Sequence, residues 1–138
     1  MANTRKNMMD ALCVQLKTMS SIDHAVLELL TPSEQRAKNK YVGVIVGDEE
    51  TVVEDSTHIR YRVDVWLKPI VRGKEIETCI KDIKNLISGT SNTIATDIGA
   101  LQVSLVGMTN PVNVTSSDQY SSAFLALDVL YVAAKAGF

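Results

Sequence analysis

The sequence predicts an α+β fold, with a mostly antiparallel sheet of about four strands and two main helices, in a single domain over residues 1–138. Two segments repeat apolar residues at helical spacing, while several others alternate apolar and polar residues or form short β-branched runs. Along the chain a helix precedes strands, and a second helix precedes two more strands. The length of 138 residues also fits one domain with its own core.

The first helix is expected to begin at Asn3 or Thr4, either of which can cap it, and to end near Thr18. Its apolar residues recur at helical spacing, at Met8, Leu12, Leu16 and Met19. The short apolar segment 25–30 fits a strand or a helical turn, and Pro32 just beyond it favours the strand weakly.

The middle of the chain predicts two strands on either side of an acidic segment. Residues 31–40 are polar and predict a loop, whereas residues 41–47 are apolar and β-branched and predict a buried strand. Residues 48–58 follow, either as the connection of a hairpin or as a long loop. The next strand is expected to end near Leu67, because Pro69 has no N–H for a strand interior.

The strand before Pro69 has two faces of different chemistry, because alternate side chains point to opposite sides of a sheet. One set is apolar and predicts the core face: Ile59, Tyr61, Val63, Val65 and Leu67. The other set mixes charges with the only tryptophan of the chain: Arg60, Arg62, Asp64, Trp66 and Lys68. Phe124 and Asp128 of the closing strand are expected on this second face. Either the N-terminal helix or another protein covers it, since aromatic and arginine side chains are enriched at interfaces.

A second helix is expected from about Lys74 to Ser88, with Gly89 as a plausible C-terminal cap. Its apolar stripe consists of Ile76, Cys79, Ile80, Ile83, Leu86 and Ile87. A polar connector leads to a strand over residues 100–107, with Leu101, Val103 and Leu105 facing inward. After a loop, residues 121–134 predict a closing strand that is apolar on both faces except for Asp128 and covered on both sides.

The overall composition excludes some classes of protein. A formal net charge of −2 argues against a chain that binds nucleic acid through its overall charge. No apolar run is long enough for a transmembrane helix or a signal peptide, so the expected location is the cytoplasm. Cys13 and Cys79 lie at apolar-compatible helical positions and are expected to be buried and reduced.

Catalytic and metal sites have little support in the sequence. His24 and His58 are far apart and have no further ligands at metal-binding spacing, so we expect no metal and no cofactor. A hydrolytic enzyme that uses Asp64 or Asp128 as acid or base stays an alternative. Arg60 and Arg62 are close enough to neutralise these carboxylates, and we favour that ion-pair interpretation.

Two charged segments complete the candidate residues. The acidic segment contains Asp48, Glu49, Glu50, Glu54 and Asp55, and is either a solvated loop or a patch that repels a polyanion. The cationic segment contains Arg36, Lys38 and Lys40, and is either solvated or a complement to an acidic neighbour.

Three stretches resemble the tail-completion proteins of long-tailed bacteriophages, which comprise tail terminators and tail-to-head joining proteins. "YVGVIVGDEE" is similar to that family's buried strand, which ends in glycine followed by acidic residues. "HIRYRVDVWLKPIVRGKEIETCIKDIKNLI" is similar to its strand ending in Val-x-Val-Trp, with a turn and an amphipathic helix after it. "DQYSSAFLALDVLYV" resembles its closing strand.

The resemblance implies a structural, non-catalytic virion protein of the tail or neck, present in the host cytoplasm during assembly. Such subunits form a homo-oligomeric ring, typically of about six copies, whose interface joins two different patches. The ring ends polymerisation of the tail tube protein and provides a docking surface for the head–tail connector protein. DNA passes through its centre without specific binding, and no membrane is involved.

Within such a ring, the charged aromatic face is expected to contact another subunit or a partner. The interface residues would be Arg60, Arg62, Asp64 and Trp66, with the cations Arg36, Lys38 and Lys40. The acidic residues 48–55 would lie at the lumen or its rim, because a surface without cations does not hold phosphate. Another neck or connector component, or a small-molecule-binding regulatory domain with a pocket between sheet and helix, stays the alternative.

Overall fold

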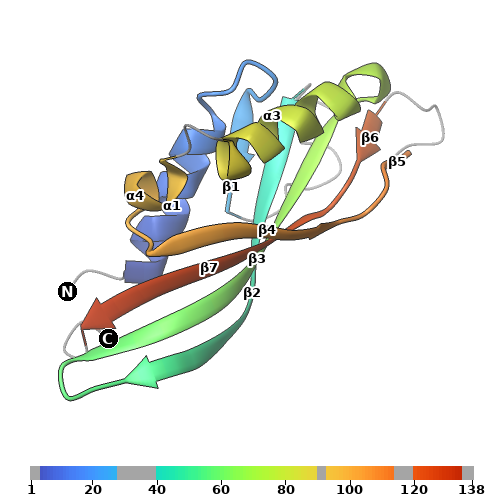
Figure 1. The fold of residues 1–138 in the computed structure, drawn as a ribbon. Helices are drawn as coiled ribbons and strands as arrows, with labels where there is room; N and C mark the ends of the chain where they lie inside the picture. The colour runs from blue at the N-terminus through green and yellow to red at the C-terminus, as the bar shows by residue number, and fades with distance from the viewer. Residues whose placement is uncertain (1–3, 28–39, 90–92, 114–119, 135–138) are drawn as a thin grey trace.

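The structure is a computed structural model that describes residues 4–27, 40–89, 93–113 and 120–134 (Figure 1). The expected loop over residues 31–39 lies outside these ranges. The elements in chain order are α1 (Thr4–Leu16), β1 (His24–Val26), β2 (Lys40–Glu54), β3 (His58–Arg72), a 3₁₀ turn (Gly73–Glu75), α3 (Ile76–Ser88), α4 (Ile94–Ile98), β4 (Gln102–Met108), β5 (Val112–Asn113), β6 (Tyr120–Ser122) and β7 (Leu125–Ala134).

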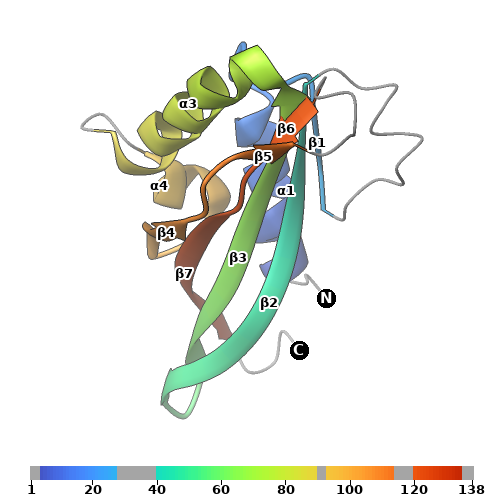
Figure 2. The same cartoon turned by 90° about the vertical axis from the view of Figure 1, so that its right-hand side faces the viewer.

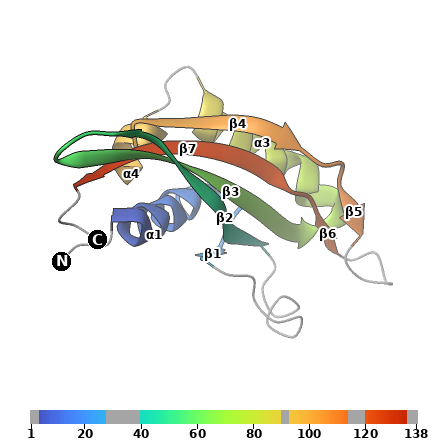
Figure 3. The same ribbon diagram turned by 90° about the horizontal axis from the view of Figure 1, so that it is seen from below.

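All of these strands belong to one sheet of seven strands. β1 pairs in parallel with β2, whereas β2–β3, β3–β6, β3–β7, β4–β7 and β5–β6 are antiparallel. Figure 3 shows β4, β7, β3 and β2 lying side by side. The predicted α+β fold with a mostly antiparallel sheet of about four strands and two helices is therefore wrong: the described chain is mostly sheet, with mixed pairing and three short helices.

The prediction failed where elements are too short to carry a pattern. β1, β5 and β6 contain two or three residues each. So few residues show no recognisable alternation of apolar and polar side chains. α4 lies inside the segment expected as a polar connector. Its two buried residues, Ile94 and Ile98, are spaced i,i+4, and Gly99 ends the helix with a φ of 80°. That spacing, with a glycine after it, was the available signal.

β3 continues through Pro69, contrary to the expected end near Leu67. On one side of β3, Leu67 pairs with Leu125 of β7 and Ile70 pairs with Ser122 of β6. Pro69 therefore lies opposite the gap between β6 and β7, where β3 has no paired partner on that side. A proline is tolerated there because the interruption removes the need for a ladder hydrogen bond.

The closing segment is also divided, because Ala123 and Phe124 separate β6 from β7. Along β7, buried residues alternate with half-buried ones up to Ala133. The expectation that this strand is covered on both faces is therefore wrong for the described chain: only one face is fully buried.

The acidic segment is mostly strand, not loop. β2 extends to Glu54 and pairs with β3, and two register shifts, between Val46 and Glu49 and between Thr51 and Val53, each place one extra residue in β2. These β-bulges bend and twist the strand. The β2–β3 hairpin extends past the helices together with the end of β7 (Figures 1 and 2).

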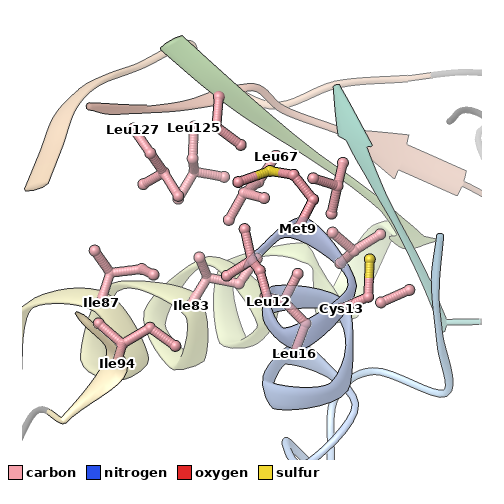
Figure 4. Close-up of a cluster of buried hydrophobic side chains, with 14 of the residues drawn as sticks. Met9, Leu12, Cys13, Leu16, Leu67, Ile83, Ile87, Ile94, Leu125 and Leu127 are labelled. Carbon is pink, nitrogen blue, oxygen red and sulfur yellow. The ribbon is translucent and has the colours of Figure 1, made fainter. Parts of the chain in front are cut away.

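The three helices pack on one side of the sheet and form the core there (Figure 4). α1 contributes Met8, Met9, Leu12, Cys13 and Leu16. α3 contributes the stripe that the sequence predicts, with Ile76, Cys79, Ile80, Ile83 and Ile87 buried. The sheet contributes Val63, Val65, Leu67, Leu125, Leu127 and Val129. The helix spacing of the sequence thus identified the buried faces of α1 and α3 correctly.

Two predicted positions near the helices have different outcomes. Gly89 follows α3, as predicted, and a Cβ there would lie 2.5 Å from the carbonyl oxygen of Asn85, so the close approach of the backbone requires glycine. Leu101 was expected to face the core, but its side chain is 53% exposed, whereas Val103 and Leu105 pack against the core as expected.

The two cysteines are free and buried, as predicted. Burial raises the pKa of the Cys79 thiol from 9.0 to about 12, and the nearby Ser21 hydroxyl opposes this shift by hydrogen bonding. Burial also raises the pKa of the Cys13 thiol. Both groups are therefore neutral thiols in the folded chain at ordinary pH.

The Cys79 thiol predicts a loss of stability at high pH. Below pH 9 the thiol is protonated in the folded and the unfolded chain and contributes no pH dependence. Between pH 9 and about 12 only the unfolded chain releases this proton, so the free energy of unfolding falls by up to about 1.4 kcal/mol per pH unit. Cys79→Ala should remove this component from the slope measured by urea unfolding at each pH. Equal slopes in the two proteins would contradict the prediction.

Candidate functional site

The part of the sheet face opposite the helices that runs from Arg60 to Lys68 of β3 is the candidate functional surface, and we call it the open face. Beyond it on the same side, Tyr41, Ile70 and Tyr120 are buried in a cluster of their own. The residues of the open face lie in register across three strands, so Arg60 pairs with Val132, Arg62 with Leu130, Asp64 with Asp128 and Trp66 with Ala126, while Gln102 and Ser104 of β4 extend two of these rows. No helix of the described chain packs on this face (Figures 1 and 2). The possibility that the N-terminal helix covers it is therefore wrong, because α1 packs on the other side.

Trp66 is the largest side chain of the open face and is 39% exposed. Its ring meets Phe124 edge to face, with centroids 6.2 Å apart. The Lys68 ammonium lies 5.2 Å from the centroid of the Phe124 ring, at cation–π distance. Ile45, Trp66, Thr109 and Phe124 line an open depression of about 320 Å³, which we call the Trp66 depression. An apolar, half-exposed aromatic cluster of this kind suits contact with another protein.

Arg62 joins two carboxylates of the open face, those of Asp128 and Glu50, into a charge network. Its Nε lies 3.2 Å from Oδ2 of Asp128, and its Nη1 lies 3.3 Å from Oε1 of Glu50. The other oxygen of Asp128, Oδ1, is buried without a hydrogen-bond partner in the described part of the chain. Since Asp128 is half-buried, the guanidinium compensates a carboxylate that water reaches only in part. For Asp128, this geometry favours the ion-pair interpretation, with Arg62 as the partner, over acid–base chemistry.

Gly47 of β2 leaves little room for a side chain beside Asp64 and Trp66 of β3. A Cβ on Gly47 would lie 3.2 Å from the carbonyl oxygen of Asp64 and 3.4 Å from Nε1 of Trp66. Gly47 also lies within the first bulge of β2, between Val46 and Glu49. The small residue therefore lets β2 pass close beside the tryptophan.

The acidic residues of β2 divide between the two faces of the sheet. Glu49 lies on the helix side, where one oxygen accepts a hydrogen bond from the Tyr131 hydroxyl and the other lies 3.7 Å from Nη1 of Arg5 in α1. Glu50 lies on the open face and binds Arg62. Glu49 and Glu50 face opposite sides because successive strand residues alternate, and the bulge between Val46 and Glu49 sets which of the two faces the helices.

Asp55 shapes the turn of the hairpin. Its Oδ1 accepts hydrogen bonds from the backbone N–H groups of Thr57 at 2.8 Å and His58 at 2.7 Å. These bonds hold the pKa of the Asp55 carboxyl below its ordinary value, because they favour the charged form. Three of the five acidic residues, Glu49, Glu50 and Asp55, therefore have structural roles that the sequence did not indicate.

The predicted site residues are only partly brought together. Arg60, Arg62, Asp64 and Trp66 share the open face, as the alternation predicts. Lys40 lies apart from these four residues, at the start of β2 and five positions before Ile45, the residue that pairs with Trp66. Its ammonium lies 3.3 Å from the carbonyl oxygen of Ser20. Arg36 and Lys38 lie outside the described residues. Lys68 belongs to the open face by the same alternation, whereas nothing in the sequence indicated Thr109.

The metal site, the regulatory pocket and the membrane segment considered from the sequence can each be compared with the described ranges. Among those residues, no three His, Cys, Asp or Glu side chains gather to hold a metal ion. The Trp66 depression is on the open face, whereas a regulatory pocket was expected between sheet and helix. None of the described helices combines the length and the apolar character needed to cross a membrane.

Exposed large apolar side chains are concentrated on the sheet. In the described chain they are Val14, Val52, Val53, Trp66, Leu101, Val106 and Met108. Only Val14 lies on a helix; the others lie on β2, β3 and β4 or, for Leu101, directly before β4. The sheet, rather than the helical layer, therefore offers the apolar surface for association.

In comparisons with known proteins, no protein-family model matches the chain, and no curated protein is significantly similar to it.

Proposed function

We propose that the chain is a structural, non-catalytic subunit that assembles into a ring at the head-proximal end of a phage tail tube. The observation that carries this proposal is the open face, where Trp66 is 39% exposed on a sheet side without a covering helix in the described chain. The resemblance of three sequence stretches to tail-completion proteins supplies the biological role. The ring ends tube polymerisation and provides the surface on which the head connector docks.

The chemistry of the open face supports contact with protein. It combines an apolar aromatic cluster with balanced charges, Arg60, Arg62 and Lys68 against Glu50, Asp64 and Asp128. A neutral, mixed face of this kind does not attract a polyanion, whereas it suits a protein partner with complementary side chains. In the proposed ring, Asp48 lies at the rim of the lumen, where a carboxylate keeps DNA from binding, whereas Glu50 belongs to the interface through Arg62.

The test is the native mass of the purified chain, measured by light scattering behind size-exclusion chromatography over a range of concentrations. We expect a closed oligomer near six subunits, because an interface between two different patches repeats head to tail around a ring. A chain that stays monomeric at every concentration contradicts self-assembly. Electron microscopy of tail tubes with the oligomer added then tests whether it caps tube ends.

A further inference from the structure

We propose that the end of the β2–β3 hairpin of one copy docks, through Val52 and Val53, in the Trp66 depression of a second copy. The inference rests on the proposed function insofar as that function requires copies to assemble, and it names the two surfaces that meet.

The hairpin end presents two adjacent β-branched side chains to water. Val52 is 40% exposed and Val53 is 53% exposed. Val52 is the extra residue of the second bulge, between Thr51 and Val53, and bulges redirect side chains from the regular pleat. The hydrogen bonds from Thr57 and His58 to Asp55 fix the turn beside them. The two valines are therefore presented on an ordered end of the sheet.

The Trp66 depression has the chemistry to receive these side chains. It is lined by Ile45, Trp66, Thr109 and Phe124, and its volume of about 320 Å³ is larger than a valine side chain. The edge-to-face packing of Trp66 on Phe124 holds its two largest walls in place. Burying a valine there removes apolar surface of both partners from water.

The valines and the depression of one copy are too far apart to meet. Val53 pairs with Arg60 of β3, whereas Ile45 pairs with Trp66, six residues further along the same strand. At about 3.3 Å per residue, this separation is about 20 Å along a continuous strand. In this proposal, the valines that fill the depression therefore come from a second copy and not from the same one.

The charges beside the two surfaces are opposite in sign. Glu54 and Asp55 follow the two valines at the hairpin end. Lys68 lies beside the depression, with its ammonium 5.2 Å from the centroid of the Phe124 ring. Docking brings the acidic hairpin end towards this cation, and the attraction between opposite charges favours this contact over contact between two copies of the same surface. Because salt screens this attraction, self-association should weaken as the salt concentration rises.

The first experiment places a charge on the hairpin end. Val53→Asp should weaken self-association at least about tenfold, measured by light scattering across a dilution series, because a carboxylate cannot enter an apolar depression without a partner. Val14→Asp is the matched control, since Val14 is 59% exposed and lies on α1. Its association should equal that of the wild type. Equal association of Val53→Asp and the wild type would overturn the proposal.

The second experiment tests the contact itself. Copies carrying Val53→Cys are mixed with copies carrying Ile45→Cys and oxidised. A disulfide needs Cα atoms about 4.4–6.8 Å apart, and the proposed docking brings the two cysteines together, so a disulfide-linked heterodimer is expected. Cys13 and Cys79 are buried, so they compete little. Val14→Cys in place of Val53→Cys should give no linked product. Assembled protein without the Val53–Ile45 bond would also overturn the proposal.

The outcomes separate this inference from the proposed function. A closed dimer with the expected cross-link supports the docking contact and contradicts the ring. A six-membered ring that tolerates Val53→Asp supports the ring and contradicts the docking contact. A wild-type chain that remains monomeric at all concentrations contradicts both.

Discussion

Leu67→Ala is expected to lower the free energy of unfolding by about 2–5 kcal/mol, the largest stability effect of a single substitution that we predict. Leu67 is fully buried and lies between the sheet and α1, near Met9 (Figure 4). Truncation removes buried apolar contacts and leaves a cavity that the rigid sheet closes only in part. Urea unfolding followed by circular dichroism, at a concentration where the chain is monomeric, measures the change.

Leu101→Ala is the matched control for that experiment, since it makes the same chemical change at an exposed leucine. Its side chain is 53% exposed, so the expected change is within about 0.5 kcal/mol. The sequence had assigned both leucines to the core. Equal losses for the two variants would contradict the burial that distinguishes them.

Trp66→Ala is expected to weaken self-association by about 2 kcal/mol, or about thirtyfold, because large aromatic side chains carry much of the energy of interfaces. The effect on the free energy of unfolding of the monomer should be smaller, since Trp66 is 39% exposed and its ring packs edge to face on Phe124. Sedimentation velocity measures association, and urea unfolding of the dilute protein measures stability.

Val14→Ala is the control, because Val14 is an exposed apolar side chain away from the open face. It should leave self-association and the free energy of unfolding unchanged. If Trp66→Ala is unfolded when dilute, Trp66 belongs to the core and the open face is not the interface. If it folds and associates like the wild type, the aromatic cluster does not contribute to assembly.

Local pattern was sufficient for the two longer helices and for the faces of the long strands. Ile76, Ile80, Ile83 and Ile87 repeat at the helical period, and all four are buried in α3. The alternation through Val63 and Val65 separated the core face from the face of Trp66. The buried stripe of a helix and the two faces of a strand depend on the spacing and polarity of residues that are close in sequence.

Strand ends were predicted poorly because they depend on pairing between distant segments. Pro69 stays within β3 because its neighbour is interrupted between β6 and β7, at residues more than fifty positions later. β2 continues through the acidic segment because β3 pairs with it and two bulges absorb the extra residues. Neither the interruption nor the bulges have a signal within the segment concerned.

The composition of the candidate surface was determined by the sequence, whereas its partners and its exposure were decided only by the tertiary structure. Alternation alone placed Arg60, Arg62, Asp64 and Trp66 on one face. Only the packing of all three helices on the opposite side leaves that face open in the described chain. Likewise, Glu49 reaches Tyr131 and Arg5 because folding joins strands and a helix that are distant in sequence. The direction of a side chain follows from its own strand, but what it meets depends on segments elsewhere in the chain.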